Sequence, residues 1–263
     1  MNLVADAFQQ AAAQGVTICV ASGDNGASDE PNATTDHVDF PASSPWVLGC
    51  GGTRLETDQS TMAITREATW NDLADGNGAT GGGVSRLFPV PDWQASAGVP
   101  ANADGSGRTG RGVPDVASLA DPETPLWVLG PNGQLGGVGG TSAAAPMWSA
   151  LIARCNQAAG TRMGFLNPLV YGQLSTAMLD ITTGGTGAYE AGPGWDACTG
   201  WGRPDGQKLL SAISHAAPAG APPAPAASAA SASAPSPAAP PASVTGPEER
   251  PAGPAPGTAG GAS

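Results

Sequence analysis

Residues 16–26 read Val-Thr-Ile-Cys-Val-Ala-Ser-Gly-Asp-Asn-Gly, an almost wholly apolar run followed by a polar, glycine-containing loop. A continuous run of this kind is typical of a strand that is buried on both faces of a parallel sheet. A helical apolar pattern over residues 2–14 precedes it, so a helix and a strand follow each other at the start of the chain. Ligands bind at the carboxyl ends of such strands, and Asp24 stands in that loop.

A second stretch combines a tight turn with the start of a helix. Residues 139–146 read Gly-Gly-Thr-Ser-Ala-Ala-Ala-Pro, and the apolar segment 147–153 follows directly. We therefore expect a helix over residues 142–159, with Pro146 in its first turn. Ser142 would then lie beside unpaired backbone N–H groups at the positive end of the helix dipole, which favours a serine nucleophile and a nascent oxyanion. A simple turn with Ser or Thr as the N-cap is the alternative.

The segments between and after these stretches also alternate in type. Strands are expected at Trp46–Cys50 and Pro125–Leu129, and short helices near residues 166–174 and 205–215. The glycine-rich residues in between are predicted to form short strands and long surface loops. This alternation predicts an α/β domain with a mainly parallel sheet.

The composition changes at about Ala216. Residues 216–263 consist almost entirely of Ala, Pro, Ser and Gly. Such a segment cannot bury enough apolar surface to offset the entropy of ordering its backbone. We therefore expect a folded domain over residues 1–215 and a disordered tail over residues 216–263.

The charge balance excludes two classes of partner. Only 12% of the 263 residues are charged, and the formal net charge is −12. A nucleic-acid-binding protein needs a basic face, and an anionic membrane attracts basic segments, so neither partner is expected. No apolar run approaches the length of a membrane span. A charge-poor, acidic surface suits a secreted protein or one that works at low pH.

The four cysteines do not form a metal or redox motif. Cys19, Cys50, Cys155 and Cys198 include no C-x-x-C pair, which argues against a zinc ribbon and a thioredoxin-type site. We expect free thiols that serve as small core residues, although their number also allows one disulfide.

The residues available for catalysis favour carboxyl chemistry over histidine chemistry. Histidine is the usual base of a serine hydrolase, but the chain has only His37, in a loop, and His215, at the border of the tail. A carboxylic acid that stays protonated can donate a hydrogen bond to an oxyanion. Asp24 suits that task, and a site built on it would work below neutral pH. An Asx-turn at Asp24 and a histidine-based site using His37 are the alternatives.

Eight sequence blocks resemble one family in the same order along the chain. Residues 21–26 and 139–146 resemble the two signature segments of the sedolisin family of serine-carboxyl peptidases, and its kumamolisin branch in particular. The other matching blocks are residues 38–45, 51–55, 80–86, 110–116, 164–168 and 191–196. The resemblance covers residues 1 to about 214 and implies a subtilisin-like three-layer fold.

The resemblance also implies a reaction and residue roles. It implies an endopeptidase that hydrolyses peptide bonds at acid pH through an acyl-enzyme. Ser142 matches the nucleophile, and Asp24 matches the aspartic acid that forms the oxyanion hole with the Ser142 N–H. Asp39 matches a residue that faces the substrate and favours a basic side chain.

One part of the family pattern has no counterpart in the chain. The family's base is a glutamate oriented by an aspartate, and both lie on a helix N-terminal to the Ser-Gly-Asp segment. No residue here matches them, so we expect an N-terminally truncated domain. A catalytically inactive remnant or a peptide-binding fragment is the alternative function.

The loop-rich segment near residues 180–196 matches the family's calcium site. Composition alone favours a surface glycine loop. The resemblance implies one structural Ca²⁺ bound by the side chains of Asp180 and Asp196 and by the carbonyl oxygens of Ile181, Gly192 and Gly194.

The resemblance finally implies a location and partners. We expect a secreted, extracellular monomer, although the chain itself has no signal-peptide pattern at its N-terminus. Its expected partners are a peptide or protein substrate and an N-terminal propeptide or the missing N-terminal part of the domain.

Overall fold

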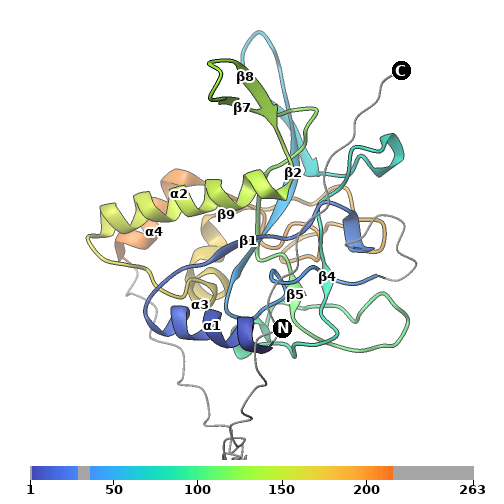
Figure 1. Cartoon of the computed structure of the whole chain (residues 1–263), viewed down its shortest axis with the longest axis vertical. Helices are drawn as coiled ribbons and strands as arrows, with labels where there is room; N and C mark the ends of the chain where they lie inside the picture. The colour runs from blue at the N-terminus through green and yellow to red at the C-terminus, as the bar shows by residue number, and fades with distance from the viewer. Residues whose placement is uncertain (1, 29–35, 216–263) are drawn as a thin grey trace, which may run out of the picture. The chain divides into compact units, whose positions relative to one another are not determined.

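The computed structural model describes residues 2–28 and 36–215, drawn in colour in Figure 1. Residues 1, 29–35 and 216–263 lie outside it. The tail expected over residues 216–263 therefore falls outside the described residues.

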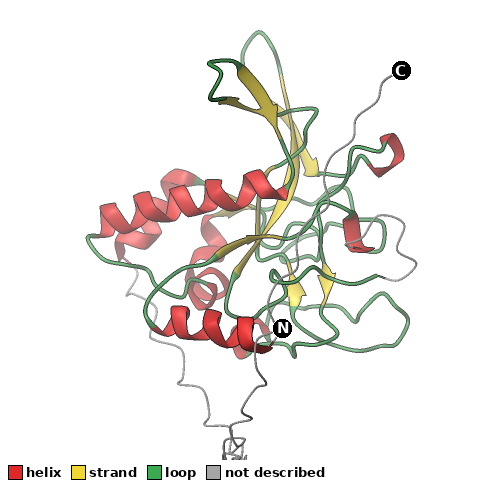
Figure 2. Ribbon diagram, viewed as in Figure 1, coloured by secondary structure: helices red, strands yellow, loops and turns green. Residues whose placement is uncertain are grey.

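The described residues form an α/β fold, and Figure 2 shows its helices and strands by colour. The helices are α1 (Asn2–Ala13), α2 (Thr141–Ala159), α3 (Asn167–Leu169) and α4 (Gly206–His215), and α3 continues into the helical segments η4 (Val170–Leu174) and η5 (Ser175–Ala177). Short 3-10 turns lie at η1 (Gly26–Ser28), η2 (Leu73–Asp75) and η3 (Asp92–Gln94). The strands are β1 (Cys19–Ala21), β2 (Leu48–Thr57), β3 (Ile64–Thr69), β4 (Gly83–Val84), β5 (Gly112–Val113), β6 (Val116–Leu119), β7 (Leu126–Leu129), β8 (Leu135–Val138), β9 (Met178–Leu179) and β10 (Arg203–Pro204).

Strand β2 is the centre of the main sheet. Cys50 pairs with Ala21 of β1 and with Val116 of β6, and both pairings are parallel. Strands β1 and β6 therefore lie on opposite edges of β2. Further along, Thr53 pairs with Thr69 of β3 in antiparallel orientation. The sheet is parallel around its buried centre, as expected, and becomes mixed where β3 joins the exposed end of β2.

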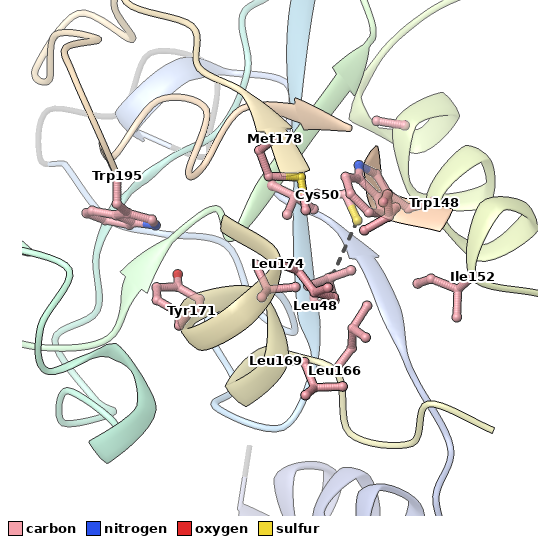
Figure 3. Close-up of a cluster of buried hydrophobic side chains, with 14 of the residues drawn as sticks. Leu48, Cys50, Trp148, Ile152, Leu166, Leu169, Tyr171, Leu174, Met178 and Trp195 are labelled. Atoms are coloured by element: carbon pink, nitrogen blue, oxygen red, sulfur yellow. Dashed lines mark hydrogen bonds between the residues drawn. The ribbon is translucent and has the colours of Figure 1, made fainter. Parts of the chain in front are cut away.

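Helix α2 packs against the sheet. It contacts β1, β2 and β6, and Figure 1 places α1 on the other side of β1. Trp148 is almost wholly buried, and its indole N–H donates to the Ala117 carbonyl of β6 at 2.9 Å. Figure 3 shows Trp148 beside Leu48, Cys50 and Met178. This apolar contact fixes the axis of α2, and with it the position of its first turn.

The main correction to the expected strands concerns β2. It was predicted to end at Cys50 but continues to Thr57, because Gly51 and Gly52 are strand residues and do not form a loop. A Cβ at Gly51 would lie 2.7 Å from the Pro114 ring, and one at Gly52 would lie 2.6 Å from the Ala120 Cβ. The absence of a side chain at these two glycines therefore allows Pro114 and Ala120 to pack closely against the sheet.

A buried ion pair joins the sheet to the helices. Arg111 and Asp115 are both fully buried, with Nη2 and Oδ2 2.6 Å apart. Asp115 also accepts hydrogen bonds from the Gly49 N–H at 2.7 Å and the Tyr171 hydroxyl at 2.8 Å. Burial raises the pKa of Asp115, while the Arg111 charge and these hydrogen bonds oppose the rise.

The cysteines are free, as expected. Burial raises the pKa of the Cys198 thiol to about 12, which makes it unreactive at physiological pH. In the described part of the chain, no helix is both long and apolar enough to cross a membrane.

Candidate active site

Ser142 is the second residue of α2 and is exposed to solvent. The first N–H groups of a helix have no partner within the helix. The Thr141 N–H is bound to Asp24, and the Ala143 N–H donates to the Gly140 carbonyl at 2.9 Å. Within residues 2–28 and 36–215, the Ser142 N–H has no hydrogen-bond acceptor. A donor and a hydroxyl from one residue therefore face solvent at the positive end of the helix.

The Asp24 carboxyl group is held against the start of α2. It follows β1 directly, and its Oδ1 accepts from the Thr141 N–H at 2.7 Å. The Thr141 hydroxyl is also 2.7 Å from Oδ1 and 3.0 Å from the Gly23 carbonyl oxygen. The structure thus brings Asp24 next to the first turn of the helix that contains Ser142. Asp24 and Thr141, which are in contact, are 117 residues apart in the sequence.

Gly140, the residue before α2, is required by its backbone and by its surroundings. Its φ is +81°, in the left-handed region that favours glycine. A Cβ at this position would lie 2.6 Å from Asp24 Oδ2. The glycine therefore makes room for the second carboxyl oxygen at the point where the helix begins.

A second loop supports Asp24 from behind. The Ala79 N–H donates to the Asp24 carbonyl at 3.0 Å, and the Gly81 N–H donates to the Gly23 carbonyl at 2.7 Å. The buried Ser22 hydroxyl returns a hydrogen bond to the Gly81 carbonyl at 2.7 Å. The segment around Gly81 therefore lies next to the loop that contains Asp24. Gly81 belongs to the sequence block 80–86.

Asp39 lies on a different segment. It is half-buried and precedes a cis peptide bond between Phe40 and Pro41. Its neighbour Val38 packs beside Gly83 of β4, and the Phe40 ring stacks on Phe88 at 6.3 Å between centroids. The structure places Asp39 beside β4, which follows the Gly81 segment along the chain.

His37 also lies in this region, beside η1. Its backbone N–H donates to the Ala27 carbonyl at 2.9 Å.

The two carboxylates expected to bind calcium belong to one folded loop. Asp180 Oδ2 accepts from the Gly194 N–H at 2.8 Å, and Asp196 Oδ2 accepts from the Gly192 N–H at 3.0 Å. Burial raises the pKa of Asp196, which also accepts from the N–H groups of Cys198 and Thr199. Among the described residues, no group of three or more His, Cys, Asp or Glu side chains is suited to a metal.

This loop also contains backbone oxygens that could bind a cation. Among the described residues, the carbonyl oxygens of Ile181, Gly192 and Gly194 accept no hydrogen bond. Two carboxylates and three unused carbonyl oxygens are the hard oxygen donors that Ca²⁺ prefers.

Sequence reasoning did not identify Thr141 as the residue that links Asp24 to α2. The signal was present, because Thr precedes Ser142 in the quoted stretch, but its side chain was assigned only a capping role. The sequence analysis also gave no role to Arg54, Asp72 and Asp121. These residues form an ion cluster behind the site.

Comparison with known proteins agrees with the fold. No family model matches the chain. Kumamolisin from Bacillus sp. (strain MN-32) is 50% identical over 222 residues, which cover 82% of this chain and 40% of that protein. Sedolisin from Pseudomonas sp. (strain 101) is 38% identical over 222 residues, which cover 78% and 36%. The chain therefore spans about two fifths of the length of these curated relatives.

A solved structure also matches the sedolisin family. Pseudomonas sedolisin, a serine-carboxyl proteinase complexed with two molecules of pseudo-iodotyrostatin, matches with a TM-score of 0.69 and 35% identity. The match covers 80% of this chain and 58% of that chain. The expected subtilisin-like α/β class is thus confirmed. By sequence and by fold, the chain belongs to the sedolisin family of serine-carboxyl peptidases and corresponds to a kumamolisin-like part of such a peptidase.

Proposed function

We propose that the chain carries the nucleophile and the oxyanion hole of an acid-acting endopeptidase. The observation that carries the proposal is the Asp24 carboxyl group, held by Thr141 at the start of α2. Thr141 directly precedes Ser142, an exposed serine whose N–H has no acceptor among the described residues. A hydroxyl, an N–H and a carboxyl group that converge at a helix N-terminus suit acyl transfer.

The proposed reaction proceeds in two steps. Ser142 Oγ attacks the peptide carbonyl carbon and gives its proton to a base, and the carbonyl oxygen becomes an oxyanion. The Ser142 N–H and the protonated Asp24 carboxyl group donate hydrogen bonds to it. The C–N bond then breaks, the amine leaves with a proton, and an acyl-serine remains. Water attacks the acyl-serine and releases the carboxylic acid and the free hydroxyl.

The geometry supports acid pH as the working range. Thr141 binds Asp24 Oδ1, which leaves Oδ2 as the oxygen available to carry a proton and donate. An ionised Asp24 would repel the oxyanion. Activity should therefore be highest at acid pH.

The base is inferred to come from a part of the full-length protein outside these 263 residues. The curated relatives are much longer than the matched region. A groove of about 340 Å³ runs between β1 and α2, where Cys19 and Ile152 contribute to its lining. We infer that the N-terminal part of the domain, with a glutamate as base, docks along this groove. A propeptide is a further partner of the whole protein.

The loop around Asp180 and Asp196 is proposed to bind one Ca²⁺. The carbonyl oxygens of Ile181, Gly192 and Gly194 would complete the ligand set. When bound, the ion would neutralise the two carboxylates and pin the loop. Its role is structural, because no step of the proposed reaction uses it.

Substrate and location are proposed on the same basis. A polypeptide is the proposed substrate, and Asp39 would face a basic side chain in the cleft. We infer a secreted, extracellular and monomeric enzyme.

One observation favours a second function. No residue of the chain matches the base pair of the family, and a nucleophile without a base has little reactivity. The 263 residues alone would then act as an inactive remnant or as a peptide-binding fragment. Binding of a peptide without its hydrolysis is the result that would identify this case.

The deciding experiment measures cleavage of a fluorogenic peptide library near pH 4 by the full-length protein and its Ser142→Ala variant. Ser211→Ala is the control, because Ser211 is an exposed serine on α4 and does not line the groove between β1 and α2. We expect turnover to be lost in Ser142→Ala and kept in Ser211→Ala. Full activity in Ser142→Ala would exclude it as the nucleophile. The reading frame upstream of Met1 should encode a Glu-x-x-x-Asp helix.

A further inference from the structure

Arg54 of β2 links two loops that have no direct role in the proposed reaction. Its Nη1 lies 3.1 Å from Asp72 Oδ1 and 3.2 Å from Asp121 Oδ2. Asp72 precedes η2, and Asp121 follows β6. Arg54 Nε also lies 3.5 Å from Glu56, a half-buried residue that forms a second ion pair with Arg66. One guanidinium thus ties together two carboxyl groups from distant parts of the chain.

The Asp72 loop leads to Asp24. The Asp72 N–H donates to the Gly78 carbonyl at 2.7 Å, and the next residue, Ala79, donates to the Asp24 carbonyl at 3.0 Å. The indole N–H of Trp70 donates to Asp72 Oδ2 at 3.2 Å, and the edge of the same ring approaches Gly78. The loop that Arg54 holds is therefore the loop that supports Asp24 from behind.

The Asp121 loop leads to the start of α2. The carbonyl oxygen of Ala120 accepts from the Gly140 N–H at 2.5 Å. A Cβ at Gly139 would lie 2.7 Å from the same oxygen, so the Gly139–Gly140 turn rests on this loop. Arg54 is therefore tied to the two loops that support the two halves of the site.

One buried oxygen of the cluster has no hydrogen-bond donor among the described residues. Asp121 is fully buried, and its Oδ2 has no hydrogen-bond partner among the described residues although Arg54 Nη1 is near. Its Oδ1 accepts from the Glu123 N–H at 2.7 Å, and the Glu123 side chain turns away to Asn77. A buried carboxyl oxygen without a donor is costly when charged. Burial raises the pKa of Asp121, and the neighbouring Asp72 carboxyl group raises it further.

We propose that Arg54 is a positioning residue for the site formed by Asp24 and Ser142, and that a proton on Asp121, donated to Asp72, completes the cluster that holds the two loops together. The inference rests on the proposed peptidase function for its catalytic consequence. A polar cavity of about 390 Å³ is lined by Arg54, Asp72, Glu56 and Arg66, so water can reach Asp72 although Asp121 itself is buried. The proton can therefore exchange with solvent through Asp72 as the pH changes.

The first test measures kcat and KM of the full-length protein near pH 4. Arg54→Gln should lower kcat about 10- to 100-fold with a smaller change in KM, because small displacements of catalytic groups cost this much. Arg54→Lys should recover part of the loss. Arg66→Gln is the matched control, because Arg66 shares Glu56 but contacts neither loop of the cluster. An Arg54→Gln protein with the kcat of Arg66→Gln would overturn the positioning role.

The second test does not depend on enzyme activity. It measures the unfolding temperature of the protein as a function of pH. Because folding raises the pKa of Asp121, its contribution to stability is full below about pH 4 and is lost as the pH rises through the folded value. In Asp121→Asn, the side-chain amide can donate a hydrogen bond at every pH, so this variant does not lose stability in this way as the pH rises. The Tm of Asp121→Asn minus that of the unchanged protein should therefore grow by about 2–4 °C from about pH 4 to pH 7.

Asp75→Asn, an exposed aspartate on η2, is the control and should show no such growth. A constant Tm difference for Asp121→Asn would overturn the proton on Asp121. An active Ser142→Ala protein would refute the proposed nucleophile but leave the unfolding result valid, so the two failures are distinguishable.

Discussion

Thr141 and Asp24 are joined through both the backbone and the side chain of the threonine. The N–H and the hydroxyl of Thr141 each lie 2.7 Å from the same oxygen, Asp24 Oδ1. Thr141 is fully buried, whereas its neighbour Ser142 is exposed. The residue before the proposed nucleophile thus fixes the carboxyl group through Oδ1, and Oδ2 is the oxygen that would meet the oxyanion in the proposed reaction.

The Thr141 hydroxyl should matter for both stability and rate. Thr141→Val keeps the shape of the side chain but removes its hydrogen bonds, so we expect a loss of about 1–2 kcal/mol in the free energy of unfolding. We also expect kcat to fall about 10-fold or more, because Asp24 is no longer held. Urea unfolding and peptide cleavage measure the two effects. Thr176→Val, at an exposed threonine, should change neither the free energy of unfolding nor kcat. Unchanged peptide cleavage by Thr141→Val would contradict the role of the Thr141 hydroxyl in holding Asp24.

A comparison of Gly140→Ala with Gly160→Ala distinguishes the effect of backbone strain from the effect of a clash with Asp24. Both have positive φ, +81° and +66°, but only a Cβ at Gly140 meets another group. Each change to Ala should cost about 1 kcal/mol of stability through the backbone. Only Gly140→Ala should also abolish peptide cleavage, since its Cβ displaces Asp24 Oδ2. Equal activity of the two variants would show that Asp24 does not need this space.

The buried Arg111–Asp115 pair should control stability in a pH-dependent way. Arg111→Met leaves the Asp115 charge buried without its partner, which should cost about 3–5 kcal/mol near neutral pH. The folded pKa of Asp115 is already raised and should rise further, so the loss should shrink as the pH falls and Asp115 takes up a proton. Thermal unfolding from about pH 4 to pH 8 measures this.

Lys208→Met provides the comparison for that pair. Lys208 lies 3.4 Å from Asp205 on the surface of α4, and its removal should cost less than about 1 kcal/mol at every pH. A loss in Arg111→Met that stays constant or grows toward acid would contradict the assignment of the buried charge.

Calcium removal should lower the stability of the loop around Asp180 and Asp196. A ligand that binds only the folded state at about 100 times its Kd contributes about 2.7 kcal/mol. Chelation with EDTA should therefore lower the unfolding temperature of the full-length protein by several degrees. In Asp180→Asn the chelator should have a much smaller effect, whereas Asp205→Asn should respond like the unchanged protein. Identical melting with calcium and with EDTA would exclude the ion.

The sequence was sufficient where a local pattern decides the structure. The apolar run that ends at Ala21, the loop that contains Asp24 and the helix that follows Gly140 each have a clear local signature. The loop and the helix lie where they were predicted, whereas β1 spans only Cys19–Ala21 of the apolar run and is half-buried. The length of β2 was not predictable, because glycine in a strand is explained only by what packs against it. At Gly51 and Gly52 that partner comes from residues 114 and 120.

The cluster of Arg54, Asp72 and Asp121 shows the same limit for side chains. Each residue is unremarkable in its own stretch, and the cluster exists only because β2 and β6 pair and β3 turns back beside them. One sequence on its own carries no record of such a contact. The fold class and the two halves of the site were therefore predictable, but the residues that hold them together were not.

The distance in sequence between Asp24 and Thr141 has a consequence for biosynthesis. Ribosomes release the chain from its N-terminus, so Asp24 emerges long before the residue that fixes it, 117 positions later. Until α2 has emerged and packed on the sheet, the nascent protein has an aspartate but no aligned nucleophile. Under the proposed function, the site that would cut peptides therefore forms only after Thr141 and Ser142 have left the ribosome.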